Sequence, residues 1–379
     1  MNVSVYLDNS ATTKPCESAV KAVNYAMTEC WGNPSSLYDM GAEAEFKISE
    51  VRDSIANILG CRSDEIFFTS GGTEANNICL HSTANALKRQ GKRIVTTSVE
   101  HPSVAKVCDL LESEGFEVIR IKPEGDGNID AQKVIAEINS DTILVSMMYV
   151  NNETGCIFPV PEVAKYLKSN YPSAVMHTDC VQAFGKLPTN VQKLGVDLLS
   201  ASGHKIHGPK GVGFLYKSKS LHLKPLILGG GQEKDLRSGT EPVPAILGLG
   251  AALCELKTAD SLKKMQTLHE YAADSLKKIP GLVFNSPLQG SLPYILNVSI
   301  CGYRSETLLH FLESKKIYVS SGSACSKGKG SHVLTEMGID KDRTDSALRI
   351  SFSRYTNKDD IDALCSALVE ATTKLRRKQ

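Results

Sequence analysis

The central part of the chain alternates short apolar segments with longer segments in which apolar residues recur at helical spacing. Ile143-Leu144-Val145 is typical of the short segments, because a strand covered on both faces of a sheet carries apolar side chains at every position. We expect strands at 65–69, 93–98, 116–121, 142–148, 174–178, 196–201 and 211–216, and helices at 74–90, 102–114, 130–139 and 160–170. This alternation predicts an α/β fold with a mostly parallel seven-stranded sheet.

The pattern changes on either side of this region. We expect an extended arm at 1–13, helices at 18–29 and 41–59, and one long helical stretch at 242–279. Strands are then expected at 294–299, 318–320 and 348–352, and helices at 305–313 and 358–374. The sequence therefore predicts a large domain over 15–250 and a smaller α+β domain formed by 1–14 and 251–379.

Composition narrows the classes of function. The 43 basic and 42 acidic residues give a net charge of +1, so we expect no direct binding to nucleic acid, which depends on clustered cations. The apolar stretch from Ala245 to Cys254 is well below the roughly 18 residues that a membrane span needs. The first residues lack the basic start and apolar middle of a secretory signal. We expect a cytoplasmic protein whose cysteines, none in a C-x-x-C pair, are reduced thiols and not zinc ligands.

Two glycines follow the first expected strand of the sheet. The segment Thr69-Ser70-Gly71-Gly72-Thr73-Glu74 runs from that strand into a helix. Glycines allow close approach of the backbone to a ligand, and a helix N-terminus presents free N–H groups to an anion. The segment matches neither the dinucleotide nor the P-loop pattern. It is therefore a candidate phosphate site, or a tight turn in which Thr73 caps the helix.

A lysine and an aspartate follow two other strands, at the sheet edge where α/β proteins bind ligands. Lys205 follows strand 196–201, and a buried lysine is suited to Schiff-base chemistry; a surface lysine is the alternative, and Lys210 is the rival candidate. Asp179 ends strand 174–178, and one partner for a buried aspartate is a protonated pyridine nitrogen. An anion site, a lysine and an aspartate together predict pyridoxal phosphate as the cofactor.

Ordered motifs extend over nearly the whole chain. They are Tyr6-Leu7-Asp8-Asn9-Ser10-Ala11-Thr12-Thr13, Glu100-His101, Asn151-Asn152-Glu153, Asp179 with Gln182, Ser202-Gly203-His204-Lys205, Arg237-Ser238-Gly239-Thr240 and Ser320-Ser321-Gly322-Ser323-Ala324-Cys325. In type and order these residues resemble the NifS/IscS-type cysteine desulfurases, pyridoxal-phosphate enzymes of the class V aminotransferase group. The resemblance implies the aspartate-aminotransferase-like fold (fold type I), L-cysteine as substrate and a homodimer.

The resemblance also implies roles for individual residues. Lys205 binds the cofactor covalently, and His101 stacks on its ring and assists proton transfers. The other expected cofactor ligands are Asp179 at the pyridinium nitrogen, Gln182 at the ring hydroxyl, Gly72, Thr73, Ser202 and His204 at the phosphate, Thr240 from the second subunit, and Asn152. Asn152 and Arg349 hold the substrate carboxylate. The plainer alternatives are a turn cap for Asn152, a surface ion pair for Arg349 and a helix-start residue for His101.

Cys325 distinguishes the reaction within this group. It lies in a stretch, 320–330, that is rich in glycine and lacks large apolar residues, and Lys327 and Lys329 follow it. We expect its thiolate to take the sulfur of L-cysteine, which leaves L-alanine and a persulfide. The persulfide is then passed to an acceptor protein, either an iron–sulfur scaffold or a tRNA-thiolating enzyme.

Other interpretations stay open at this stage. They include an exposed structural thiol at 325, another class V enzyme such as a selenocysteine lyase, an aminotransferase or a kynureninase-like enzyme, and a non-catalytic scaffold. No resident metal is expected, and Cys325 is a candidate cluster ligand only in complex with a scaffold. Cys180 is expected to be a packing thiol, with a second sulfur relay as the alternative, and Cys156 and Cys301 have no assigned role.

Overall fold

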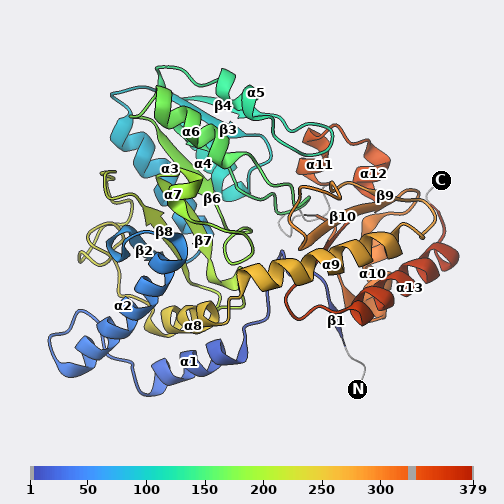
Figure 1. Cartoon of the computed structure of the whole chain (residues 1–379), viewed down its shortest axis with the longest axis horizontal. Coiled ribbons are helices and arrows are strands. Elements are labelled where there is room, and N and C mark those ends of the chain that lie inside the picture. The colour runs from blue at the N-terminus through green and yellow to red at the C-terminus, as the bar shows by residue number, and fades with distance from the viewer. Residues whose placement is uncertain (1–3, 323–329, 378–379) are drawn as a thin grey trace.

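The computed structural model describes residues 4–322 and 330–377, and its largest element is a seven-stranded sheet (Figure 1). The strands are β2 (Ile66–Thr69), β3 (Arg93–Thr97), β4 (Glu117–Ile121), β5 (Thr142–Ser146), β6 (Val175–Asp179), β7 (Leu198–Ser202) and β8 (Gly213–Lys217). Their order is β2-β8-β7-β6-β5-β3-β4, and β8 is antiparallel to both of its neighbours while β7 to β4 are parallel. The prediction of a mostly parallel seven-stranded sheet is therefore confirmed.

Two apolar cores cover the two faces of this sheet. Leu144 and Leu198 belong to one core, and their chain neighbours Val145 and Leu199 belong to the other, because successive strand residues point to opposite faces. Helices α3 (Gly72–Leu87) and α4 (Pro102–Ser113) supply the first core; α6 (Val160–Asn170) and α7 (Val191–Leu194) supply the second. The remaining short elements of this region are η1 (Ser63–Glu65), α5 (Ala131–Ala136) and η2 (Gly203–Lys205).

Helices α1 (Glu17–Thr28), α2 (Asp39–Leu59) and α8 (Val243–Cys254) pack together beside the β2 and β8 end of the sheet (Figure 1). The single helical stretch expected over 242–279 is wrong, because α8 ends at Cys254 and α9 (Thr258–Leu276) begins after a short break. Glu255 at the break accepts hydrogen bonds from Arg354 and Ser18. Neither glycine nor proline marks this break, so the periodicity continues across it.

The C-terminal part of the chain forms a second, antiparallel sheet of order β12-β10-β9. The helices and strands of this C-terminal part after α9 are β9 (Leu282–Phe284), β10 (Ile295–Ile300), α10 (Ser305–Ser314), β11 (Ile317–Tyr318), α11 (His332–Glu336), α12 (Lys341–Asp345), β12 (Ala347–Ser351) and α13 (Lys358–Lys374). The sequence did not predict β9, α11 and α12, which are too short to show a clear period. The domain boundaries at 14/15 and 250/251 stay a prediction.

The N-terminal arm joins this C-terminal part, as expected. Strand β1 (Val5–Tyr6) pairs in parallel with β11, and Asp8 bridges to Ser351 at the end of β12. The arm then continues to Thr13, whose N–H and hydroxyl both donate to the carbonyl of His204. The arm therefore passes beside the cavity described below, which Ser10 and Ala11 line. Within 4–322 and 330–377, no helix is both long and apolar enough to cross a bilayer.

Candidate active site

A cavity of about 310 Å³ lies where β6, β7 and the start of α3 meet the arm and β12. A volume of this size is typical of small-molecule sites. Ten sequence-predicted residues line it: Gly72, Thr73, His101, Asn152, Asp179, Gln182, Ser202, His204, Lys205 and Arg349. The Gly72–Thr73 segment, Asp179 and Lys205 were predicted from the sheet edge at which strand ends meet, and the other residues were predicted from the family resemblance.

Two predicted site residues are not part of this lining. Thr240 is exposed and lines a separate surface hollow with Trp31, which agrees with its expected role toward a second subunit but does not test that role. Cys325 lies outside the described residues. The described chain on either side of it is held close to the cavity: the backbones of Ser320 and Arg349 exchange two hydrogen bonds, and Ser331 donates to the buried carboxylate of Glu153.

Lys205 closes a 3-10 turn directly after β7 and brings its amine into the cavity. Its Nζ donates to the backbone carbonyls of Ser10 and Ala11, the second at 2.9 Å. The rival Lys210 is exposed five residues later. The N-terminal arm therefore positions the amine that the sequence singled out, a contact between residues almost two hundred positions apart.

Asp179 is the last residue of β6 and is buried, with 6% of its surface exposed. One carboxylate oxygen accepts from Asn76 Nδ2 at 2.7 Å, and the other accepts from the backbone N–H of Val181 at 2.8 Å. Asn76 also donates to Ser103 Oγ at 2.8 Å. Sequence reasoning missed Asn76, although it lies four residues after Gly72 on α3 and so on the same side of that helix. The carboxylate is thus oriented from two directions.

The start of α3 supplies an anion site. Gly71 has φ +152°, a conformation that side chains disfavour, and the helix begins at Gly72. A Cβ on Gly72 would lie 2.5 Å from Val181 Cγ2. Thr73 therefore lies within the first turn, and the alternative that it caps the helix is wrong. Ser202 and His204 line the cavity beside this helix start, whose free N–H groups and dipole favour a phosphate.

The two histidines of the cavity are held in their neutral form. His101 caps α4, and its Nδ1 accepts from the backbone N–H of Ser103 at 3.1 Å. Burial lowers the pKa of His101, although the charge of Asp179 acts in the opposite direction. Burial also lowers the pKa of His204 to about 4, and the positive charge of Lys205 adds to this effect. Because Nδ1 of His101 accepts, its other ring nitrogen carries the proton in the neutral form.

Arg349 extends from β12 toward the opposite side of the cavity and is almost fully buried. Its Nη2 donates to Asp8 Oδ1 at 2.8 Å, and its Nη1 donates to the carbonyl of Asn152 at 3.1 Å. The surface ion pair considered for Arg349 is therefore wrong, because the side chain is buried and its ion pair with Asp8 lies beside the cavity. Its Nε has no hydrogen-bond partner in the described part of the chain. A buried guanidinium with donor capacity to spare suits a carboxylate ligand.

These groups fit pyridoxal phosphate. The cavity combines an amine, a buried carboxylate and an anion site at a helix start, and Asn76 Oδ1 is a buried acceptor that finds no partner among the described residues. The last two features leave hydrogen-bonding capacity that a polar ligand would satisfy. Cys180, next to Asp179, points instead into the apolar core, and burial raises the pKa of its thiol.

Comparison with known proteins gives one consistent result. The family model for class-V aminotransferases matches residues 5–364. The cysteine desulfurase IscS of Methanosarcina thermophila is 41% identical over 380 residues, which cover 99% of this chain and 93% of that protein. A solved NifS-like protein has a TM-score of 0.93 at 36% identity and covers 98% of this chain and 100% of its own. SspA, solved in complex with cysteine, has a TM-score of 0.83 at 32% identity over 94% of this chain and 100% of its own.

Proposed function

This chain belongs to the class-V aminotransferase family, and we propose that it is a pyridoxal-phosphate-dependent cysteine desulfurase that converts L-cysteine to L-alanine. The observation that carries the proposal is the meeting of the Lys205 amine, the Asp179 carboxylate and the α3 anion site in one cavity. The relatives that are named cysteine desulfurases favour this reaction over a selenocysteine lyase, an aminotransferase or a non-catalytic scaffold.

Each side of the cavity holds a different part of the cofactor. Lys205 would form the covalent link, Asp179 would pair with the ring nitrogen, Gln182 would donate to the ring oxygen and His101 would lie against the ring. The phosphate would be held by the start of α3 at Gly72 and Thr73, together with Ser202, His204 and the partner subunit's Thr240. When bound, pyridoxal phosphate withdraws electrons from the substrate carbons, so that the Cα proton becomes acidic and the substrate sulfur becomes open to a nucleophile.

The chain's own residues bind the substrate and move protons. Arg349, oriented by Asp8, and Asn152 hold the substrate carboxylate on the side of the cavity opposite the α3 anion site. The Lys205 amine would accept the Cα proton, because the carbonyls of Ser10 and Ala11 hold this amine in the cavity and an amine can act as a general base. Neutral His101 carries a proton on Nε2 and would exchange it with the substrate in the cavity.

Sulfur transfer uses Cys325. Its thiolate attacks the Sγ of the substrate; an S–S bond forms, the Cβ–S bond breaks, and its electron pair stays with carbon, which takes up a proton to give alanine. The net change is one enzyme thiol and one L-cysteine converted to one enzyme persulfide and one L-alanine. An acceptor thiol then attacks the outer sulfur and restores the Cys325 thiol. We propose an iron–sulfur scaffold or a tRNA-thiolating enzyme as the acceptor, and a cytoplasmic location remains part of the proposal.

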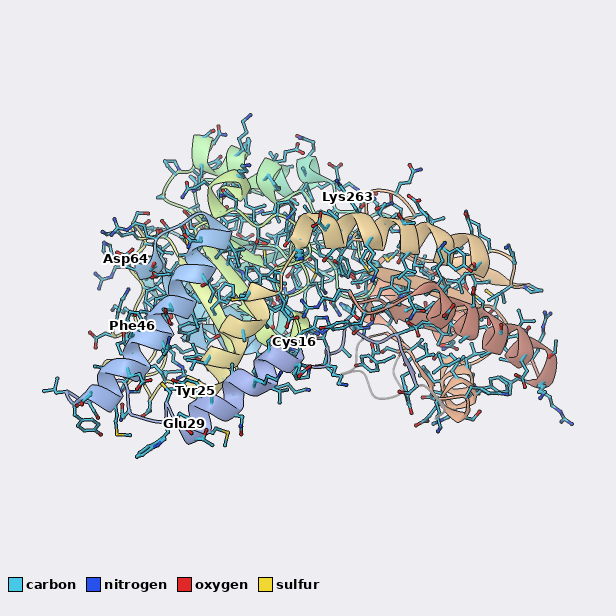
Figure 2. The ribbon with its side chains drawn as sticks, turned by 60° about the horizontal axis from the view of Figure 1, so that its bottom comes forward. Cys16, Tyr25, Glu29, Phe46, Asp64 and Lys263 are labelled. Atoms are coloured by element: carbon cyan, nitrogen blue, oxygen red, sulfur yellow. The ribbon has the colours of Figure 1, made fainter. Side chains whose placement is uncertain are left out.

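A homodimer completes the site in this proposal. Large apolar side chains are exposed on and between α1 and α2, including Trp31 at 64% and Phe46 at 61% (Figure 2 labels Phe46 and Tyr25 on this face). Contiguous exposed apolar surface marks association sites. Thr240 shares a hollow with Trp31, so a second copy docked on this face would bring Thr240 of each chain toward the other.

The experiment that tests the function follows the product and the cofactor separately. The purified protein is loaded with pyridoxal phosphate and mixed with L-cysteine, and alanine, sulfide and the visible absorption band are measured. Lys205→Ala is expected to lose the band and the activity, whereas Cys325→Ala keeps the band and loses sulfide release. Cys301→Ala is the matched control and behaves as wild type. Desulfuration by Cys325→Ala at the wild-type rate would contradict the persulfide step and favour a lyase.

A further inference from the structure

Lys186 is a second lysine beside the active site and is more deeply buried than Lys205, and sequence reasoning did not identify it. It lies in the turn that follows β6, with 6% of its surface exposed. Its Nζ donates to Gln182 Oε1 at 3.1 Å and lies 5.6 Å from the centre of the Tyr294 ring. No carboxylate of the described residues lies within ion-pair distance of this amine, so its main polar contact is an amide of the cofactor site. A buried amine of this kind needs an explanation other than surface solvation.

The contact fixes the orientation of the Gln182 amide. A glutamine amide has an acceptor on one side and two N–H donors on the other, whereas an ammonium group can only donate. Lys186 therefore selects the rotamer in which Oε1 faces Lys186 and Nε2 faces away from it. In this rotamer Nε2 donates to the carbonyl of Ser10 at 3.0 Å. Because Gln182 lines the cavity, its second N–H is left for a ligand oxygen.

The same carbonyl connects the two lysines. Ser10 O accepts from Gln182 Nε2 and from Lys205 Nζ, so hydrogen bonds run without interruption from Lys186 through Gln182 and Ser10 to Lys205. The ionisable groups that interact with Lys186 are Lys205, Arg349, His204 and His207. Burial lowers the pKa of Lys186 to about 7, and the charges of Lys205 and Arg349 contribute. An anionic ligand oxygen at Gln182 would supply the negative charge that is missing here.

Resting on the proposed function, we propose that Lys186 is a positioning residue of the cofactor site. It holds the Gln182 amide with its N–H toward the ring oxygen of pyridoxal phosphate, and its charge favours the anionic form of that oxygen. Both effects lower the pKa of the nitrogen that links Lys205 to the cofactor. A proton on that nitrogen would add a positive charge close to other cations and hydrogen-bond donors. Lys186 itself touches neither substrate nor cofactor.

The test is a pH titration of the visible band of the loaded enzyme, which requires no turnover. Lys186→Met removes both the donor and the charge. It should raise the midpoint pH of this titration by about one unit, because the protonated link between Lys205 and the cofactor would no longer lie near the Lys186 cation. Lys186→Arg keeps both features and should titrate close to wild type. In the Gln182→Met background, adding Lys186→Met should shift the midpoint much less, because the amide through which Lys186 acts is gone.

Two results overturn the proposal. One is a Lys186→Met variant that titrates as wild type; the other is an equal shift with and without Gln182, which would mean that the charge acts independently of the amide. Thermal unfolding of the cofactor-free proteins shows whether each variant keeps its fold. If Lys186→Met does not fold, Lys186→Gln takes its place: it removes the charge, keeps a hydrogen-bond donor and is also expected to raise the midpoint of the titration. A wild-type protein that takes up no cofactor overturns the proposed function and this inference together, whereas a normal band with an unshifted Lys186→Met variant overturns this inference alone.

Discussion

The carboxylate of Asp8 and the guanidinium of Arg349 form an ion pair of 2.8 Å that joins the N-terminal arm to β12. The arginine side chain is 2% exposed and the aspartate side chain 19%. Breaking a buried ion pair from one side leaves a charge without compensation, which is more costly than removing both partners. This pair therefore links the stability of the chain to the orientation of the proposed carboxylate-binding group.

Replacing Asp8 with leucine should lower the free energy of unfolding of the cofactor-free protein by about 3 kcal/mol, because Arg349 would stay buried without its partner. The same replacement in an Arg349→Met background should cost much less. Urea unfolding of the four proteins gives this double-mutant cycle. Glu17→Leu, which breaks an exposed pair with Lys21, is the control and should change little. Equal losses in both backgrounds would show that the pair carries no coupling.

Gly72→Ala should weaken binding of pyridoxal phosphate by about tenfold, the equivalent of one lost hydrogen bond. The added methyl group would press on Val181 and move the start of α3 away from the cavity. Gly125→Ala is the matched control, since a Cβ at that position meets no atom within 4 Å. Absorbance titration of the cofactor-free proteins measures both affinities, and an unchanged affinity in Gly72→Ala would argue against a phosphate at this helix start.

Subunits that lack Lys205 and subunits that lack Thr240 should complement one another. In a mixed dimer, the chain with Thr240→Val keeps its own Lys205 and receives the partner's Thr240, so one of the two sites is complete. Random pairing of the two variants should restore about a quarter of the wild-type activity, since half of the dimers are mixed and each holds one intact site. Trp31→Glu should prevent recovery by disrupting the apolar face. Two inactive variants that stay inactive after mixing would exclude a shared site.

The free energy of unfolding should fall in acid because of His177. Burial lowers the pKa of this histidine to about 3, and its ring nitrogens contact the hydroxyl groups of Ser146 and Ser200. Above pH 6.5 the His177 imidazole is neutral in both the folded and the unfolded chain. As the pH falls from 6.5 toward 3, the imidazole binds a proton in the unfolded chain but not in the folded chain, so the folded state loses stability. The slope contributed is up to about 1.4 kcal/mol per pH unit, and it should vanish in His177→Gln. Chemical unfolding between pH 7 and 4 measures it, with the exposed His310→Gln as control.

The sequence predicted the parts of the site that lie on regular elements. Asp179 and Lys205 follow neighbouring buried strands, and Gly72 opens a helix after a third, so the geometry of an α/β sheet brings them together whatever the loops do. The family resemblance supplied the specific roles. The same regularity explains why strand positions were predicted to within a few residues.

The supporting contacts could not be predicted in the same way. Asp8 and Arg349 are far apart in the sequence, and their pairing depends on the path of an arm that has no period of its own. Gly185-Lys186-Leu187-Pro188 has the composition of an exposed turn, so its pattern gives no sign that the lysine is buried. The helix break after Cys254 has the same origin, because tertiary contacts of Glu255 and not local signals end the helix.

The path of the arm also has a consequence for biosynthesis. Residues 5–11 are made before the large sheet, yet their partners in β11 and β12 are made after it. A nascent chain can form the large sheet before β12, which carries Arg349, has been made. At that stage the arm is not yet held by its partners, so the carbonyls of Ser10 and Ala11 that bind Lys205 are not yet fixed in place. We therefore expect chains that end before β12 to be inactive toward cysteine, because they lack Arg349.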